Sequence, residues 1–249
     1  MATLSLKKIA TTAPKTSNKD TTKLKTAALI KELQELQNVL MASATNSVLL
    51  VIQGLDASGK DGLVKNVLGS INPQGVTVKS FKAPTAEELR HDILWRIHKE
   101  TPEKGMIKVF NRSHYEDILI TRVHGWCDDA TATKRIKAIN DFENLLTQHG
   151  NTTIIKVYLH ISQEEQHIRL KERMTDPTKM WKYNENDWKE SELWSKYHIA
   201  YEDCITQTSA IPWHIIPADQ NWYKENLVAN LLVAALKKMD LKYPTIKTL

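Results

Sequence analysis

The sequence predicts an α/β fold in which a parallel central sheet carries helices on both faces. The first observation is a strand-length segment, residues 47–53, whose centre is entirely apolar, as is typical of a strand buried on both faces. The second is that segments of this kind alternate along the chain with segments of helical periodicity, the pattern of a parallel sheet covered by helices. A length of 249 residues suits one domain of this class.

Each element follows from its own local pattern. Leucines at positions 29, 33, 36 and 40 form an apolar stripe, which predicts a helix over about 21–44. The strand at 47–53 runs into a glycine-rich turn and then a short helix over about 63–68. Further strands are expected at 76–81, 106–110, 153–160 and 213–216, and further helices at 85–97, 131–149 and 223–239. The helix at 85–97 should begin at Thr85, because Thr85 and Glu88 have the spacing of a capping box.

Two segments are expected to lie outside this core. Residues 1–20 are rich in lysine, threonine and serine and poor in bulky apolar side chains, so we expect a basic, disordered tail before a single domain of residues 21–249. Residues 163–212 separate the last two strands and are helical in pattern but highly charged and rich in aromatic residues. A polar helical segment in this position predicts a mobile lid rather than core.

Charge and composition exclude several classes of protein. Residues 1–25 hold six lysines and one aspartate and account for the whole net charge of +5, so the remaining body shows no basic surface for nucleic acid. Cys127 and Cys204 are too few for a disulfide framework and indicate a reduced, cytoplasmic protein. No apolar stretch approaches the ~18 residues of a membrane helix. We therefore expect neither a membrane nor a nucleic-acid partner.

The turn after the first strand has the spacing of a phosphate-binding P-loop, Gly54-x-x-x-x-Gly59-Lys60. It stands between a predicted strand and a predicted helix, which is the context that this motif requires. Its backbone N–H groups and the helix N-terminus favour an anion, and Lys60 is expected to reach the terminal phosphates. The predicted phosphate-binding backbone positions are Gly54, Ala57, Ser58, Gly59 and Gly62.

Two carboxylates distinguish this loop from an ordinary P-loop. Asp61 replaces the Ser or Thr that normally follows the lysine, and Asp56 lies inside the loop. Carboxylates beside a phosphate chain repel it unless a divalent cation stands between them, and Mg²⁺ prefers such oxygen ligands. We therefore predict that Asp56 and Asp61 bind Mg²⁺, with Mn²⁺ as a substitute. The alternatives are a favourable helix-dipole acid for Asp61 and a turn-forming side chain for Asp56.

A second constellation, Phe110-Asn-Arg-Ser-His-Tyr-Glu116, follows the predicted strand at 106–110. In a doubly wound sheet it opens at the carboxyl edge, where ligands bind. Arg112 offers a planar fork to phosphoryl oxygens, although a surface ion pair with Glu116 is the alternative. His114 is expected to be an ordinary packed histidine, and the nine histidines show no spacing typical of a zinc site.

These residues resemble the family-2 polyphosphate kinases over most of the chain, from about Thr22 to about Met239. The resemblance implies a three-layer P-loop kinase fold, similar to thymidylate kinase, with a helical lid. It also implies reversible, Mg²⁺-assisted phosphoryl transfer between inorganic polyphosphate and nucleoside mono- or diphosphates, in a homo-oligomer of two or four subunits. The matching segments are 54–62, 80–85, 110–117, Arg169-x-x-x-Arg173 with Asp176-Pro177, 179–182, Pro212-Trp213 and Ala218-Asp219.

One position departs from the commoner family pattern. Many members have Asp-Arg-Ser in the second constellation, and here it is Asn111-Arg112-Ser113. The Asn form resembles the subgroup that phosphorylates both AMP and ADP, with GMP and GDP as further candidate acceptors. Because an amide is a weaker metal ligand than a carboxylate, Asp56 and Asp61 would carry the ion.

The predicted site therefore has two groups of residues. Those expected to act on the reacting phosphates are Asp56, Lys60, Asp61 and Arg112. Further residues are expected to bind phosphate or nucleotide, and they lie in the helix after the P-loop, in the segment after the strand at 76–81, in the second constellation and in the lid. They are Lys65, Lys82, Asn111, Ser113, Tyr115, Glu116, Arg169, Arg173, Lys179 and Lys182.

Two other functions are compatible with the same motifs. An ATP-dependent nucleoside or nucleotide kinase would normally keep Ser or Thr after the P-loop lysine, and this chain has Asp61. A non-catalytic protein that binds nucleotides or polyanions through the basic tail would lose binding when residues 1–20 are deleted. A kinase should instead depend on Lys60 and tolerate that deletion.

Overall fold

Five strands form one parallel sheet in the order β2-β3-β1-β4-β5, which confirms the predicted fold class. The structure is a computed structural model that describes residues 4–246. The strands are β1 (Ser47–Gly54), β2 (Val76–Ser80), β3 (Ile107–Asn111), β4 (Thr152–His160) and β5 (Trp213–Pro217). Every residue of the central β1 is buried, which agrees with its unbroken apolar run.

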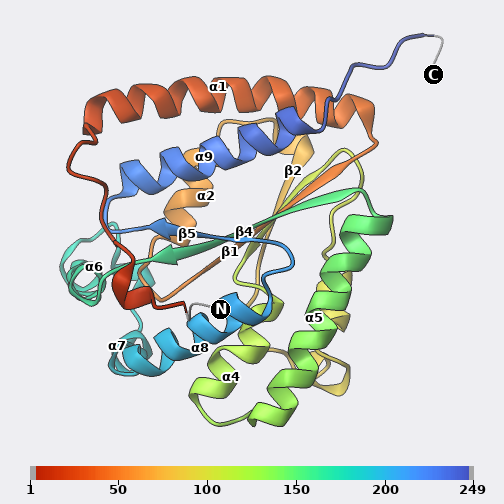
Figure 1. The fold of residues 1–249 in the computed structure, drawn as a ribbon. Helices are drawn as coiled ribbons and strands as arrows, with labels where there is room; N and C mark the ends of the chain where they lie inside the picture. The colour runs from red at the N-terminus through yellow and green to blue at the C-terminus, as the bar shows by residue number, and fades with distance from the viewer. Residues whose placement is uncertain (1–3, 247–249) are drawn as a thin grey trace.

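Helices cover the sheet in two layers (Figure 1). One layer contains α1 (Lys19–Ser43), α2 (Lys60–Leu68) and α9 (Asn221–Lys238), and the other contains α4 (Ile120–Val123), α5 (Asp129–His149) and α8 (Trp194–Gln207). The leucine stripe of α1 faces inward, since Leu33 and Leu40 are completely buried. The predicted helices at 21–44, 131–149 and 223–239 are therefore confirmed, with small shifts at their ends.

The segment predicted as a lid, residues 163–212, contains a polar, largely exposed part and a helix that packs in the core. After β4, the chain forms α6 (Gln163–Thr175), a 3₁₀ turn η5 (Met180–Lys182) and α7 (Glu185–Glu192), and these elements are polar and largely exposed. The next helix, α8, buries Tyr201, Cys204 and Ile205 in the core. Its apolar residues recur at helical spacing and pack onto the sheet, so α8 belongs to the core and the predicted boundary at 212 was wrong.

The predicted helix at 85–97 is also wrong. The capping box does form, because Thr85 and Glu88 exchange side chain-to-backbone hydrogen bonds of 2.8 and 3.2 Å. However, only a 3₁₀ turn η3 (Glu88–Arg90) follows, and His91 is extended before the short helix α3 (Trp95–His98). Leu89, which the apolar face of a helix would bury, is exposed. Without tertiary packing, a cap does not propagate a helix.

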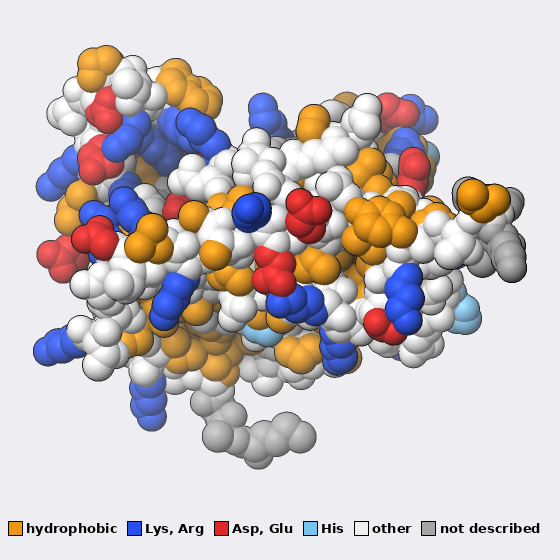
Figure 2. Space-filling model, turned by 90° about the horizontal axis from the view of Figure 1, so that it is seen from above, with side chains coloured by type: hydrophobic (Ala, Val, Ile, Leu, Met, Phe, Trp, Pro, Cys, Tyr) orange, Lys and Arg blue, Asp and Glu red, His pale blue; other side chains and the backbone are white. Residues whose placement is uncertain are grey.

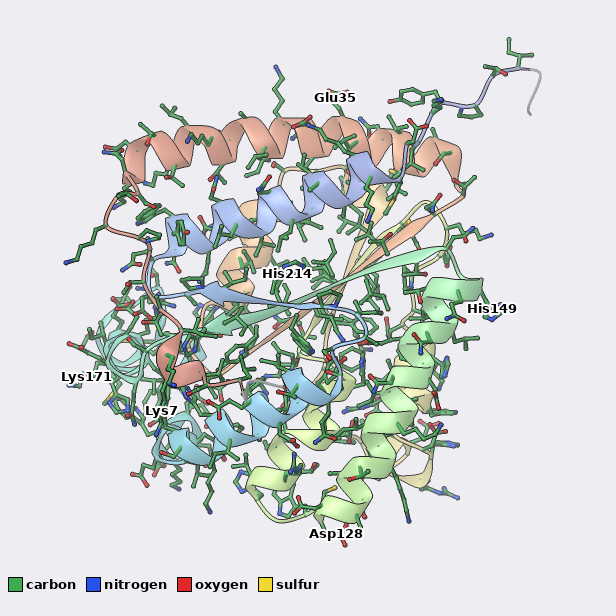
Figure 3. The ribbon with its side chains drawn as sticks, viewed as in Figure 1. Lys7, Glu35, Asp128, His149, Lys171 and His214 are labelled. Atoms are coloured by element: carbon green, nitrogen blue, oxygen red, sulfur yellow. The ribbon has the colours of Figure 1, made fainter. Side chains whose placement is uncertain are left out.

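The N-terminal segment is packed rather than disordered from residue 4 onward, while residues 1–3 lie outside the described part. A 3₁₀ turn η1 (Leu6–Lys8) buries Leu6 completely. The Leu6 N–H donates to Glu202 Oε1 at 2.7 Å, and His160 Nε2 bonds the Leu6 carbonyl at 3.1 Å. Lys7, in this segment, and Lys171, in α6, lie on the same side of the molecule (Figure 3). Composition indicated disorder, but a few apolar side chains are enough to anchor the segment.

Leu6→Ala is expected to lower the free energy of unfolding by about 2–4 kcal/mol, because it removes a fully buried leucine side chain,. Urea unfolding followed by circular dichroism checks the value, with the exposed Leu24→Ala of α1 as the matched control. If residues 1–20 were a disordered tail, both substitutions would leave stability unchanged.

Candidate active site

The P-loop joins β1 to α2 at the carboxyl edge of the sheet. Gly59 caps α2 with a positive φ of 88°, a conformation that glycine adopts without strain. The first turn of α2 leaves backbone N–H groups without partners inside the helix, and these groups carry the positive end of the helix dipole. The local structure therefore presents the groups that favour an anion, and phosphate binding at this turn stays a prediction.

A cleft of about 960 Å³ opens over this turn. Its walls come from the P-loop, from the ends of β2 and β3, and from the polar elements α6, η5 and α7. Lys and Arg side chains gather toward the left of the face shown in Figure 2, the side on which α6 lies in Figure 1. The predicted site residues that line this cleft are Asp56, Ala57, Gly59, Lys60, Asp61, Gly62, Lys82, Asn111, Arg112, Arg169, Arg173, Lys179 and Lys182.

The remaining predicted residues do not line this cleft. Gly54 and Glu116 border a separate, much smaller cavity on the other side of Asp56 and Arg112. Lys65 and Ser58 line neither cavity, and the same holds for the pair Ser113 and Tyr115.

Tyr115 supports the second constellation from behind and has no access to a ligand. It is 0% exposed, its hydroxyl donates to Glu143 Oε1 at 2.6 Å, and Lys156 Nζ donates to the same hydroxyl at 2.9 Å. Lys156 also pairs with Glu143 Oε2 at 2.8 Å. Ser113 is equally buried, and its hydroxyl accepts the Tyr115 N–H at 3.2 Å. The structure thus places both residues in the scaffold of the loop that carries Arg112.

Lys60 is folded back onto its own loop. Its ammonium donates to the carbonyls of Gly54 at 2.6 Å and Leu55 at 3.0 Å, and the side chain is buried. Burial and then the charge of Arg112 lower the pKa of Lys60 to about 8. The lysine is therefore poised at the base of the cleft with neutral partners that an anion can replace.

Asp56 and Arg112 form an ion pair across the cleft floor. Arg112 has a positive φ of 62°, an uncommon conformation for a residue other than glycine and one that clusters at functional sites. Burial alone would raise the pKa of Asp56, but Lys60 and Arg112 lower it below its ordinary value. Asp56 is thus a carboxylate at neutral pH, and Arg112 pairs with it rather than with Glu116.

Asp61 is held from two sides. Asn111 Nδ2 donates to its Oδ1 at 2.9 Å, and Lys182 of η5 approaches its Oδ2 at 2.7 Å. Burial would raise the pKa of Asp61, but the hydrogen bonds from Lys182 and Asn111 lower it. Asn111 therefore uses its amide –NH₂ to orient Asp61, so the position that departs from the commoner pattern acts here as a hydrogen-bond donor.

The cationic residues that line the cleft from the polar segment have protein partners. Arg173 pairs with Asp187 of α7, and Lys179 pairs with Glu172 at 2.7 Å. Arg169 differs because its guanidinium donates to backbone carbonyls, Ala57 at 3.1 Å in the P-loop and Asp219 at 2.7 Å before α9. Arg169 thus joins α6 to the P-loop, whereas Arg173 and Lys179 pair with carboxylates of the polar segment, and Arg173 also donates to the Lys182 carbonyl at 3.4 Å.

Sequence reasoning missed several residues of this region, and three of them bear on the site. Asp187 and Asn221 line the cleft, and Lys224 of α9 lies beneath the P-loop with its ammonium 3.1 Å from the Ser58 carbonyl. A signal for Lys224 was present, since it precedes Val228 and Leu232 at the spacing of four that defines the buried stripe of α9,. A lysine on an apolar stripe is unusual and marks a special environment.

Comparisons with known proteins identify the family. The family model for polyphosphate kinase 2 matches residues 16–244. The chain belongs to the polyphosphate kinase 2 family. It is 44% identical to the AMP/ADP-polyphosphate phosphotransferase of Meiothermus ruber over 224 residues, covering 89% of this chain and 84% of that protein. It is 40% identical to the ADP-polyphosphate phosphotransferase of Rhodopseudomonas palustris over 229 residues, covering 86% and 79%.

A solved structure agrees with the assignment. The crystal structure of polyphosphate kinase 2 from Arthrobacter aurescens TC1 is 44% identical, with a TM-score of 0.94, and the match covers 97% of this chain and 88% of that one. The chain is therefore a polyphosphate kinase, and the family decides against the ATP-dependent nucleoside kinase and the non-catalytic binding protein.

The cleft of this polyphosphate kinase offers two carboxylates as ligands for Mg²⁺. Asp56 and Asp61 both line the cleft and are both carboxylates at neutral pH. Over residues 4–246, no group of three or more His, Cys, Asp or Glu side chains is arranged to hold a metal ion. One or two carboxylates with phosphate oxygens and water form the usual Mg²⁺ environment. The donor set therefore fits an ion that arrives with the phosphates.

Proposed function

We propose that this polyphosphate kinase transfers a phosphoryl group reversibly between inorganic polyphosphate and AMP or ADP, assisted by Mg²⁺, with Mn²⁺ as a substitute. Two relatives named as ADP- and AMP/ADP-polyphosphate phosphotransferases support the choice of substrates. The observation that carries the proposal is the cleft itself, in which Lys60, Arg112 and the basic residues of α6 and η5 face one volume.

Phosphate binding in the cleft would replace ion pairs within the protein by ion pairs with the ligand. Its carboxylates now neutralise its cations, as in the pairs Asp56–Arg112 and Asp61–Lys182. Incoming phosphates replace the carboxylates as partners of Arg112 and Lys182, and charge-assisted bonds of this kind are strong. The same exchange frees Asp56 and Asp61, which would hold Mg²⁺ against the phosphate chain. When bound, the ion supplies charge neutralisation between two polyanions.

Phosphoryl transfer needs in-line positioning and neutralised charge more than covalent help. Lys60 would neutralise charge at the reacting phosphate from the base of the cleft, and Arg112 from the end of β3. Such preorganised cations stabilise the transition state most where water is excluded. Arg173, Lys179 and Lys182 would extend the cationic wall along the donor chain.

A donor–acceptor matrix tests the proposal. Polyphosphate and ATP serve as donors against AMP, ADP, GMP and GDP, with and without Mg²⁺, and products are separated by ion-exchange chromatography. We expect polyphosphate with AMP and with ADP to give ADP and ATP. Activity confined to ATP as donor would contradict the proposal.

The pH profile is a further prediction. Because Lys60 loses its proton as the pH rises through about 8, the free enzyme loses a cation that the donor requires. We expect kcat/KM for polyphosphate to fall above pH 8, by up to about tenfold per unit. Lys60→Arg keeps its charge throughout this range and should lack the part of the decline that the titration of Lys60 causes, so a wild-type profile that stays flat from pH 7 to 9.5 would refute the role.

The proposal also covers the cellular location, the assembly and the partners of the enzyme. Among residues 4–246, no helix is both long and apolar enough to cross a membrane. We propose a cytoplasmic homo-oligomer of two or four subunits, as the family resemblance implies, with purine nucleotides as acceptors and no nucleic-acid partner. Light scattering coupled to size-exclusion chromatography tests the assembly.

A further inference from the structure

Within residues 4–246, Lys224 is a buried cation that bonds no carboxylate. It is one of two lysines among the largest fully buried side chains of residues 4–246, and only 1% of it is exposed. The other, Lys156, has the carboxylate of Glu143 at 2.8 Å. Lys224 bonds only neutral oxygens, the Ser58 carbonyl at 3.1 Å and Asn221 Oδ1 at 2.7 Å. Burying a charge without a counter-charge is costly, and an anion bound nearby would lower that cost.

The bond to Ser58 sets the direction of the P-loop backbone. A trans peptide points its carbonyl and its N–H in opposite directions, so the bond from Lys224 turns the N–H of Gly59 away from α9. Gly59 itself lines the cleft, and a Cβ at this position would overlap with the Lys224 ammonium. Lys224 thus packs against the rear of the loop while the loop's donors face the phosphate side.

The bond to Asn221 has a similar effect on a side chain. Asn221 lines the cleft, and its carbonyl oxygen accepts from Lys224 at 2.7 Å. The –NH₂ end of the amide is then the end left for a ligand. One buried ammonium therefore orients two hydrogen-bond donors, one from the backbone and one from a side chain.

Positive charge dominates around Lys224. Arg169 of α6 and Lys60 of α2 act on it from two sides, and the acids that face it, Glu165 of α6 and Glu225 of α9, are engaged elsewhere. Glu165 pairs with Arg169 at 2.8 Å, and Glu225 accepts from Asn66 at 2.7 Å. Burial first, and then Arg169, lower the pKa of Lys224 to about 7. A bound polyanion would bring negative charge close to Lys224, which would raise its pKa and favour the protonated ammonium.

We propose that Lys224 is a positioning residue for the phosphate donor, which it serves by fixing the Ser58–Gly59 peptide and Asn221 and by placing a positive charge behind the loop. This inference rests on the proposed function. It adds a residue of α9, more than 160 positions from the P-loop, to the phosphate-binding apparatus.

The test compares Lys224→Met, which removes the charge but keeps the length, with Lys224→Arg, which keeps the charge. Lys238→Met, at an exposed position of the same helix, is the matched control. Steady-state kinetics with polyphosphate and ADP give KM and kcat separately. Calorimetry with tripolyphosphate at pH 7, in two buffers of different ionisation enthalpy, gives proton uptake on binding without turnover.

For Lys224→Met we expect the KM for polyphosphate to rise at least about tenfold, with a smaller change in kcat. Proton uptake on binding tripolyphosphate should be smaller than in the wild type. The melting temperature should be equal or higher, because an apolar residue replaces an unpaired buried charge. Lys224→Arg should recover most of the affinity, and Lys238→Met should match the wild type in every measurement.

Two results would overturn the inference. One is an active wild type with Lys224→Met unchanged in KM and proton uptake. The other is a Lys224→Met protein whose melting temperature falls together with its activity and which Lys224→Arg does not rescue, since that pattern describes a residue needed only for folding. A wild type inactive with polyphosphate would instead refute the proposed function, and tripolyphosphate binding would still decide whether Lys224 positions the loop.

Discussion

Lys60→Met is expected to lower kcat/KM for polyphosphate by about 100- to 1,000-fold, the range found when a preorganised charge at a reacting centre is removed. Lys60 is the cation at the base of the cleft, where it donates only to the carbonyls of Gly54 and Leu55. Phosphate oxygens replace these carbonyls in the proposed complex, so the substitution should lower the reaction rate and leave the folded structure unchanged. Initial rates of ATP formation from ADP check the value.

The control for this variant is Lys134→Met, at an exposed position of α5 on the opposite layer. We expect the control to keep wild-type rates, and both variants to keep the wild-type circular dichroism spectrum. A Lys60→Met enzyme within fivefold of the wild type would show that the P-loop binds phosphate without this ammonium.

Asp56→Asn is expected to lower kcat by about 100-fold and to raise the concentration of Mg²⁺ at which the rate is half-maximal. The carboxylate is ionised, because Lys60 and Arg112 lower its pKa, and it lines the cleft beside the P-loop. The amide keeps the shape of the side chain but is a poorer ligand for a hard cation. Rates measured across a Mg²⁺ titration separate the two effects.

Asp141→Asn is the matched control, since Asp141 is an exposed partner of Lys137 on α5. It should leave both the rate and the Mg²⁺ dependence unchanged. If Asp56→Asn reduced the rate but left the Mg²⁺ dependence as it was, Asp56 would serve only to orient Arg112.

The parts of this enzyme that were predictable are those with a local cause. The apolar run of β1 predicts a central strand because both of its faces need packing, and the spacing of Gly54, Gly59 and Lys60 predicts an anion-binding turn. The prediction of a helix over 85–97 was wrong because Thr85 and Glu88 complete their hydrogen bonds within one turn, and Leu89, which follows, is exposed and not packed in the core.

The features that were not predicted depend on contacts between residues distant in the sequence. No local pattern pairs Asp56 with Arg112 or Lys182 with Asp61, because each pair forms only when the sheet brings its elements together. The N-terminal segment shows the same limit. Its average composition is polar, yet one side chain, Leu6, is fully buried, and the segment is anchored further where Thr11 donates to Asp219 at 2.8 Å.

Arg169 and Asp219 connect these distant parts to the cleft. Asp219 accepts from the Ser162 N–H at the start of α6 at 2.8 Å, and its backbone carbonyl accepts from Arg169. Arg169 in turn contacts the carbonyl of Ala57. The N-terminal segment, α6 and the P-loop therefore form one connected scaffold, so a deletion of residues 1–20 is expected to disturb the active site, contrary to the interpretation as a dispensable tail.

Asp56 and Asp61 are expected to hold a divalent ion only together with phosphate. Electron paramagnetic resonance of Mn²⁺ measures this directly, with the wild type and the Asp56→Asn/Asp61→Asn double variant titrated in the presence and absence of ADP with tripolyphosphate. We predict that the wild type binds Mn²⁺ at least about tenfold more tightly when both ligands are present, and that the double variant loses this gain. Equal Mn²⁺ affinity in the two proteins, or unchanged turnover in EDTA, would contradict a role of Asp56 and Asp61 in holding the ion.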